Sequence, residues 1–161
     1  MLASLSLDLD NKWSYLKTHG DEAWSKLPSY LDLVVPRILN TLDEFDLKIT
    51  FFIVGLDADQ EANSSALRQI SQAGHEIGNH SYRHEPWLHL YSREEIVAEF
   101  AKTEVALERV TGRKPIGFRG PGFSLLVANA PVGPSAQALP AGVAAFRYIQ
   151  RYFFITSYFF Y

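Results

Sequence analysis

The sequence predicts an α/β domain in which helices cover a parallel sheet. Two observations predict this class. Runs of β-branched and aromatic residues alternate along the chain with segments whose apolar residues recur at helical spacing. The repeated order of strand and helix is typical of parallel strands joined by crossover helices. A length of 161 residues allows one domain with a substantial core and is too short for two. This alternation fits an open sheet and a barrel equally well.

Four segments have the pattern of strands. Residues 2–10 alternate apolar and polar side chains. Residues 47–55, LKITFFIVG, form a β-branched and aromatic run that we expect to be buried on both faces of the sheet. Residues 75–80, HEIGNH, predict a short strand that runs into a loop, and residues 116–120, IGFRG, predict the next strand.

Three segments have the apolar spacing of helices: residues 36–45, 62–73 and 92–112. Pro36 suits the first position of a helix, where no intrahelical N–H is needed. Gly74 is expected to end the second helix. Ser92 and Glu95 have the spacing of a capping box at the start of the third.

The composition excludes several classes of function. The net charge is -3 and the chain has no basic run, so we expect no nucleic-acid partner. The absence of cysteine excludes disulfides, thiolate metal sites and a cysteine nucleophile. No stretch approaches the roughly 18 apolar residues of a membrane span. The first residues lack a cationic segment and their apolar run ends at Asp8, so we expect a cytoplasmic protein rather than a secreted one.

Polar side chains gather where the predicted strands end. These residues are Asp8, Asp10, His80, His84 and Arg119. The carboxyl ends of parallel strands meet at one edge of a sheet or barrel, and reactive groups collect there. We therefore expect these five side chains to lie close together.

The two histidines and the two aspartates predict a metal site. His80 and His84 are one helical turn apart, so both rings can face one ion, although such a pair alone is more often a surface or core feature. Asp8 and Asp10 share one face of their strand. Two histidines and one carboxylate leave a position for water, as in catalytic zinc sites, and also suit cobalt or iron. The second aspartate can then accept a proton, with Arg119 holding it ionised.

Three motifs, TFFIVG, GHEIGNHSYRH and FRGPGFS, occur in an order and spacing that resemble the polysaccharide deacetylase family, the NodB-homology domains among carbohydrate esterases. The resemblance implies an irregular (β/α) barrel with one divalent metal ion, usually zinc. It also implies the hydrolysis of N- or O-acetyl groups on sugars, or of other amides in some members. It defines a predicted domain over residues 1–124 and ends before the late strands, so the implied barrel is incomplete.

The resemblance also implies roles for individual residues. Asp8 matches the general base and Arg119 the residue that orients it, which makes them the implied catalytic pair. Asp10, His80 and His84 match the metal ligands.

Five further residues match supporting positions of the family. The substrate wall is implied at Pro121, Gly122 and Phe123. Ser81 is expected to support the loop between the two ligand histidines, and His75 to have a structural role.

The chain departs from the family pattern in two ways. Leu9 separates the two aspartates, which resembles the peptidoglycan and amidase-type branches and leaves the substrate open between an N-acetylated glycan and a small amide. The family has a general acid in a late histidine motif, and no histidine follows His89. The alternatives are therefore an active deacetylase, an amidohydrolase of non-sugar amides, or a pseudoenzyme that binds metal or glycan without turnover. An incomplete barrel also exposes a sheet edge through which the chain can form oligomers.

Two segments have more than one interpretation. Trp13 and Trp24 fit either stacking on sugar faces or packing of a loop. Residues 125–161 form an atypical tail, in which Arg147 and Arg151 are the only charged residues. This tail is either a foreign or out-of-frame end or a native segment that packs on the sheet or on a partner.

Overall fold

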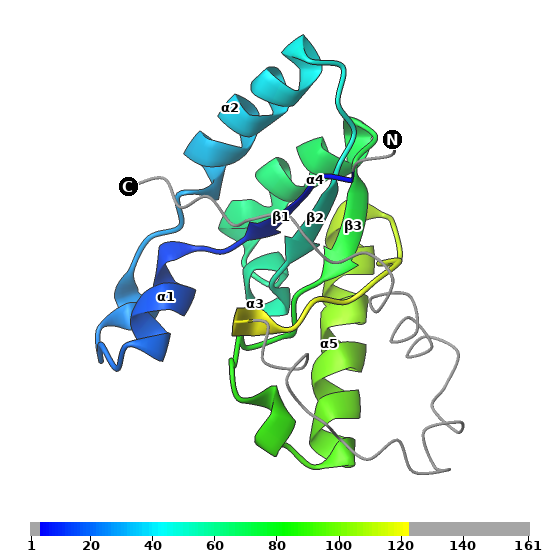
Figure 1. Ribbon diagram of the computed structural model, residues 1–161. Coiled ribbons are helices and arrows are strands. Elements are labelled where there is room, and N and C mark those ends of the chain that lie inside the picture. The colour runs from blue at the N-terminus through cyan, green and yellow to red at the C-terminus, as the bar shows by residue number, and fades with distance from the viewer. Residues whose placement is uncertain (1–3, 123–161) are drawn as a thin grey trace, which may run out of the picture.

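The computed structural model describes residues 4–122, and a three-stranded parallel sheet lies at its centre (Figure 1). The strands, in spatial order, are β1 (Ser6–Leu9), β2 (Thr50–Ile53) and β3 (Glu76–Asn79). Leu9 pairs with Ile53, which pairs in turn with Asn79, so the carboxyl ends of the three strands lie level at one edge. The predicted α/β class with a parallel sheet is confirmed.

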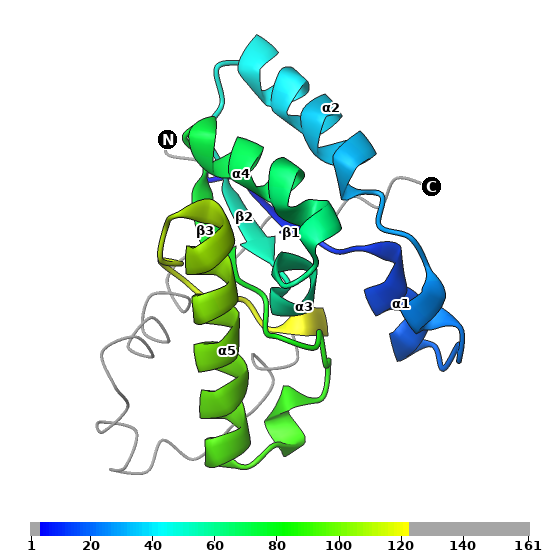
Figure 2. The ribbon, with the colours of Figure 1, turned by 180° about the vertical axis from the view of Figure 1, so that it is seen from behind.

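Helices cover one face of this sheet. The α-helices are α1 (Lys12–Thr18), α2 (Leu31–Glu44), α3 (Gly55–Ala58), α4 (Ser64–Gln72) and α5 (Arg93–Thr111). Short 3₁₀ helices are η1 (Trp24–Lys26), η2 (Glu61–Asn63) and η3 (Leu88–Leu90). Helices α2, α4 and α5 lie on the side of the strands that Figure 2 presents. Apolar side chains from these helices form the main core with Phe51, Ile53 and Ile77 of the sheet.

Local sequence signals place the ends of the longest helix. Ser92 Oγ accepts a hydrogen bond from the backbone N of Glu95 at 3.2 Å, and Glu95 Oε2 accepts one from the backbone N of Ser92 at 2.7 Å. Gly112 ends α5 in the left-handed conformation, with φ of 69°. The predicted capping box and the predicted stop at Gly112 are both confirmed. Gly74, after α4, also has a positive φ, as a stop at this position requires.

The prediction for α2 was wrong at its start. The helix begins at Leu31, so Pro36 lies inside it and not at its first position. Proline has no N–H, so the carbonyl of Asp32 loses its partner within the helix. Asp32 is exposed, and water can replace that bond. The buried residues Leu31 and Val35 anchor this first part of the helix against the core.

Two strand predictions also need correction. β2 is buried on one face only: Phe51 and Ile53 are fully buried, whereas Thr50 and Phe52 are only partly buried. The face that bears Phe52 is not the one packed by the helices. Residues 116–120 do not form a regular strand but run beside β3 through a single parallel bridge between Asn79 and Phe118.

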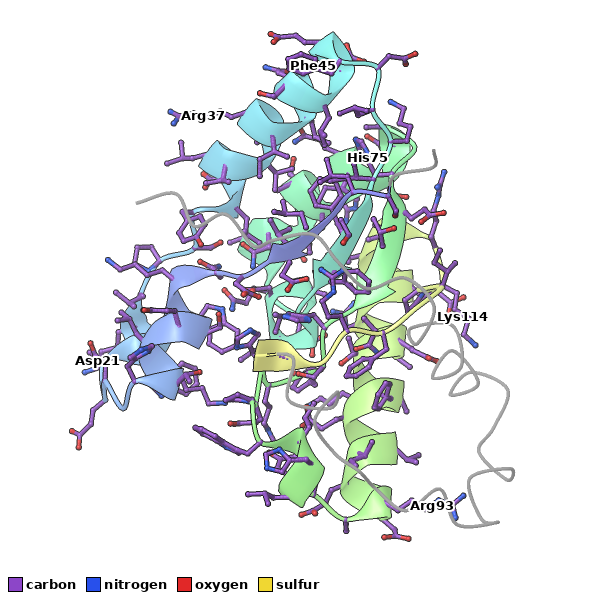
Figure 3. The ribbon with its side chains drawn as sticks, viewed as in Figure 1. Asp21, Arg37, Phe45, His75, Arg93 and Lys114 are labelled. Carbon is purple, nitrogen blue, oxygen red and sulfur yellow. The ribbon has the colours of Figure 1, made fainter. Side chains whose placement is uncertain are left out.

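His75 marks the end of the sheet opposite the carboxyl edge, as its label in Figure 3 shows. Its Nδ1 accepts a hydrogen bond from the backbone N of Ile49 at 3.2 Å, and its ring meets Phe51 edge-on. His75 therefore has a structural contact, as expected. Across residues 4–122, no helix combines the length and the apolar character needed to cross a membrane. Residues 125–161, the predicted tail, lie outside the described part of the chain.

Candidate metal centre

Three predicted ligands converge at the carboxyl edge of the sheet. Asp10 follows β1, His80 follows β3, and His84 lies four residues further on. The Nε2 atoms of His80 and His84 lie 3.4 and 3.2 Å from Oδ1 of Asp10. One ligand atom of each residue lies within 4.8 Å of the others. This spacing is compatible with one ion between the three side chains.

A backbone contact orients the ring of His80. Its Nδ1 lies 2.8 Å from the carbonyl oxygen of Arg119, which can only accept, so Nδ1–H is the donor. Nε2 is then unprotonated and faces Asp10. Burial lowers the pKa of His80, more than the neighbouring carboxylates Asp10 and Asp8 raise it. The ring is therefore neutral near pH 7, which is the state that binds a metal ion.

The polar atoms of the cluster have unused bonding capacity. Within residues 4–122, Oδ1 of Asp10 and both ring nitrogens of His84 are buried and make no hydrogen bond. Burial raises the pKa of Asp10, but the neighbouring imidazoles of His84 and His80 lower it by more, so the net shift is downward. An ionised carboxylate, the unsatisfied imidazole of His84 and Nε2 of His80 form a donor set that fits a divalent cation.

Asp8 lies beside this cluster and is held by Arg119. Nη1 of Arg119 donates to Oδ1 of Asp8 at 2.6 Å, and Nη2 donates to Ser6 Oγ at 2.5 Å. The other oxygen of Asp8, Oδ2, lies 4.0 Å from Nε2 of His80. One carboxylate oxygen is thus fixed by the arginine, while the second faces the candidate metal site.

An aromatic side chain supports the guanidinium from the sheet. The centre of the Arg119 guanidinium lies 4.1 Å from the ring centroid of Phe52. The ring of Phe52 lies against Gly78, where a Cβ atom would come within 2.5 Å of it. A side chain at Gly78 of the GHEIGNH motif would therefore collide with the ring of Phe52 in its position beside Arg119.

The loop between the two histidines has an unusual backbone. Ser81 and His84 have φ of 61° and 54°, in the left-handed region that residues other than glycine rarely adopt. Ser81 Oγ accepts from the backbone N of His84 at 3.1 Å, and Asn79 Oδ1 accepts from the backbone N of Ser81 at 2.9 Å. Ser81 thus contacts the loop in the manner expected of a supporting residue.

The predicted substrate wall is partly described. Pro121 is buried, and Gly122 has a φ of 61°. A Cβ atom at Gly122 would lie 3.3 Å from Pro86, so this segment adjoins the loop that follows His84. Phe123 lies outside the described residues, and its role stays a prediction.

The two tryptophans occupy different environments. Trp13 is buried and its Nε1 donates to Oδ1 of Asp57 at 2.7 Å, which agrees with packing of a loop. Trp24 is only partly buried, and its ring centroid lies 5.5 Å from that of Trp13. It lines a cavity of about 530 Å³, together with Lys17, Leu56, Tyr82, Arg83 and Glu85.

Sequence reasoning missed a buried carboxylate behind the cluster. Oδ1 of Asp57 accepts from Trp13, from Asn11 Nδ2 at 3.1 Å and from Asn63 Nδ2 at 3.3 Å. Burial raises the pKa of Asp57 to about 6, although the hydrogen bonds from Trp13 and Asn11 lower it. Asn11 directly follows the predicted ligand Asp10, so Asp57 ties that segment to α3. Asp57 comes shortly after β2, and polar residues that follow parallel strands gather at the carboxyl edge of the sheet. Its position in the sequence could therefore have indicated it.

The phenol of Tyr30, a second residue that sequence reasoning missed, donates a hydrogen bond to the backbone carbonyl of Asp10. Tyr30 precedes α2, so this contact holds the backbone of a predicted ligand from another element. No motif in the sequence marks this residue.

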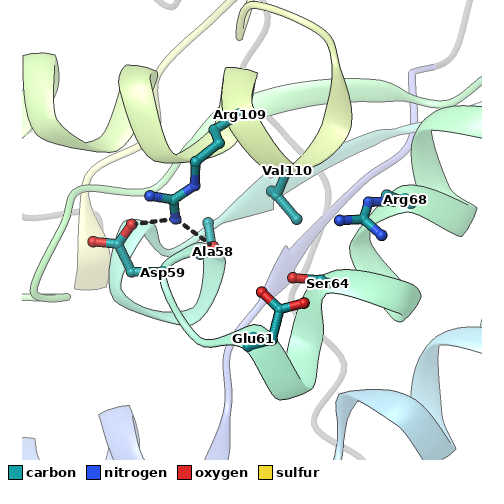
Figure 4. A pocket seen from close by; sticks show the side chains of 7 residues that line it. All are labelled: Ala58, Asp59, Glu61, Ser64, Arg68, Arg109 and Val110. Carbon is teal, nitrogen blue, oxygen red and sulfur yellow. Dashed lines mark hydrogen bonds and ion pairs between the residues drawn. The ribbon is translucent and has the colours of Figure 1, made fainter.

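A second cavity, of about 380 Å³, is lined by residues other than the predicted ligands, and Figure 4 shows these lining residues. Arg109 of α5 borders it and donates to Oδ1 of Asp59 at 2.7 Å. Arg68, Glu61 and Ser64 also line it. Its charges are balanced, and it contains none of the residues of the candidate metal centre.

The fold and the site together define an α/β protein with two histidines and a carboxylate at the carboxyl edge of a parallel sheet. The family model described as polysaccharide deacetylase matches residues 22–137. The chain therefore belongs to the polysaccharide deacetylase family.

Individual relatives agree with this assignment. The chain is 37% identical over 86 residues to a peptidoglycan-N-acetylglucosamine deacetylase of Bacillus cereus, covering 53% of the chain and 30% of that enzyme. It thus spans less than a third of this relative. It also resembles a cobalt-bound family 4 acetyl xylan esterase from Clostridium thermocellum, with 26% identity and a TM-score of 0.56, over 74% of the chain and 48% of the esterase.

A third relative has a different description. The wild-type BA3943 protein of Bacillus anthracis, described as a CE4 family pseudoenzyme, matches with 28% identity and a TM-score of 0.57. The match covers 75% of the chain and 35% of that protein. The predicted family and its α/β fold are confirmed, and the relatives include both enzymes and a pseudoenzyme.

Proposed function

We propose that this chain supplies the metal-binding part of a hydrolase that removes acetyl groups from N-acetylated polysaccharide. The cluster of Asp10, His80 and His84, with Asp8 beside it, is the observation that carries this proposal. The name of the Bacillus cereus relative supports N-acetylglucosamine in peptidoglycan as the substrate class.

Asp10, His80 and His84 would hold one divalent ion through one oxygen and two nitrogens. This mixed donor set suits zinc, and also cobalt or iron. The cobalt ion of the Clostridium thermocellum esterase supports a metal of this type in the fold. Such an ion, when bound, lowers the pKa of a coordinated water and polarises the acetyl carbonyl.

Asp8 would act as the general base. Its Oδ1 is engaged by Arg119, so the free oxygen Oδ2 faces the cluster and can accept a proton from the attacking water. The charge-assisted hydrogen bond from Arg119 would hold Asp8 in one orientation during the reaction. Pro121 and Gly122, beside Pro86, would shape the wall along which the sugar lies.

Acetate release from N-acetylglucosamine oligomers tests this proposal. We expect the zinc-loaded wild-type chain to release acetate and Asp8→Asn to lose roughly 10²- to 10⁴-fold in rate, because the base is removed. Asp43→Asn, which changes an exposed carboxylate on α2, is the matched control and is expected to keep the wild-type rate. Ammonia release from small amides, without acetate release, would instead indicate an amidohydrolase of non-sugar amides.

A second candidate is binding without turnover. One observation favours it: one structural relative is described as a pseudoenzyme. One bound metal ion per chain, together with no acetate or ammonia release from the wild type, would favour this candidate over the enzyme.

A further inference from the structure

We infer that Glu99 of α5 is a positioning residue that holds the loop bearing His80 and His84 in its metal-binding conformation. This inference rests on the proposed metal centre. Glu99 is neither a predicted ligand nor part of the motifs that carry the family resemblance. Its carboxylate is buried, although glutamate at this depth is uncommon unless it is paired.

The contacts of Glu99 are with the backbone of the loop. Oε2 accepts hydrogen bonds from the backbone N atoms of Tyr82 and Arg83, both at 3.0 Å. Oε1 lies 3.5 Å from Nη1 of Arg83. A single carboxylate oxygen thus satisfies two consecutive amides between the two ligand histidines.

This loop depends on side chains for its hydrogen bonds. The backbone N atoms of Ser81 and His84 are satisfied by the side chains of Asn79 and Ser81. With Glu99, all four amides from residue 81 to residue 84 bond to side-chain oxygens. Carbonyl groups of Ser81 and Tyr82 accept from the backbone of α3, at Gly55 and Leu56. The loop is therefore clamped between α3 on its carbonyl side and α5 on its amide side.

The conformation that Glu99 holds is an unfavourable one. Ser81 and His84 are both left-handed, and such residues persist only where the surroundings fix them. Without an acceptor, the amides of Tyr82 and Arg83 would be left unpaired. We expect the loop to move to satisfy them, and His84 would then leave the position at which its Nε2 lies 3.2 Å from Asp10.

Metal affinity of Glu99 variants tests the inference. Glu99→Ala removes the acceptor, and we expect zinc or cobalt to bind roughly 10- to 100-fold more weakly, as when a group that orients a metal ligand is lost. Glu99→Gln keeps an oxygen that can accept from both amides, and its affinity is expected to stay within about threefold of wild type. Glu108→Ala, on the exposed side of the same helix, is the matched control.

A second measurement separates this inference from the proposed function. Hydrogen exchange of the Tyr82 and Arg83 amides is followed in the metal-free protein. We expect faster exchange in Glu99→Ala and wild-type protection in Glu99→Gln. Wild-type metal affinity in a folded Glu99→Ala, with only its melting temperature lowered, would overturn the positioning role and leave the metal centre standing. If the wild-type chain binds no metal while the Tyr82 and Arg83 amides exchange as expected, the proposed function and the metal-positioning role of Glu99 are both overturned. Glu99 would then only stabilise the loop.

Discussion

Arg119 donates to Asp8 at 2.6 Å across 111 residues of sequence, and the carbonyl of the same arginine accepts from His80 at 2.8 Å. One residue beside β3 thus orients both the predicted base, through its side chain, and a predicted metal ligand, through its backbone. Substitution of the side chain should separate these two effects, because the backbone carbonyl is retained.

Arg119→Gln should lower the rate of acetate release while metal content stays near the wild-type level. The variant keeps the carbonyl that orients His80 and loses the guanidinium that fixes Asp8. We expect a loss of about 10²-fold in rate, since a misplaced base is much less effective. Steady-state kinetics beside metal analysis will check this. A parallel loss of metal would show that the side chain acts through the ligands instead.

His75→Ala should destabilise the protein without affecting the metal centre. His75 lies at the opposite end of β3 from His80, and its Nδ1 accepts from the buried amide of Ile49. Leaving that amide unpaired costs about 1–3 kcal/mol. Urea unfolding should show a loss of this size, with zinc affinity within about threefold of wild type. A large loss of zinc affinity in the folded variant would contradict a purely structural role.

Features set by local sequence were predicted more accurately than features that depend on tertiary packing. The capping box and Gly112 are local, so the limits of α5 were predicted well. The start of α2 was not, because Pro36 is tolerated inside a helix that Leu31 and Val35 anchor to the core. The bridge at Phe118 is a tertiary feature that no strand pattern in residues 116–120 distinguishes from a full strand.

In the candidate site too, the order of the elements predicts some residues, and others depend on tertiary contacts. Asp8, Asp10, His80 and Arg119 come together because each follows or flanks the carboxyl end of a parallel strand, a rule that needs only the order of the elements. Glu99 was missed because its position within a long helix does not reveal that it faces two loop amides. Such a role depends on the loop conformation, which the sequence pattern does not define.

Asp57 should make the stability of the metal-free protein depend on pH. Burial raises its pKa to about 6, above the ordinary value of 3.8, so the folded state holds this proton more tightly than the unfolded state does. Its contribution to stability is present below pH 4 and is lost as the pH rises through about 6. A pKa raised from 3.8 to about 6 corresponds to about 3 kcal/mol.

Comparison with Asp57→Asn isolates this group from other titrating residues. The difference in free energy of unfolding between wild type and Asp57→Asn should fall by about 2.5 kcal/mol between pH 4 and pH 7. Urea unfolding in the presence of a chelator, at several pH values, measures it. Parallel pH profiles of the two proteins would show that Asp57 is ionised equally readily in the folded and unfolded states.

The metal content of the purified chain tests the central claim most directly, measured for the wild type, Asp10→Ala, His80→Ala and His75→Ala. The structure predicts about one zinc-like ion per wild-type chain, since Asp10, His80 and His84 form a single three-ligand cluster. The ion should be lost in Asp10→Ala and His80→Ala and kept in His75→Ala. A folded wild-type protein that binds no divalent metal, or one whose metal survives both ligand substitutions, would contradict the assignment of this cluster as the metal centre.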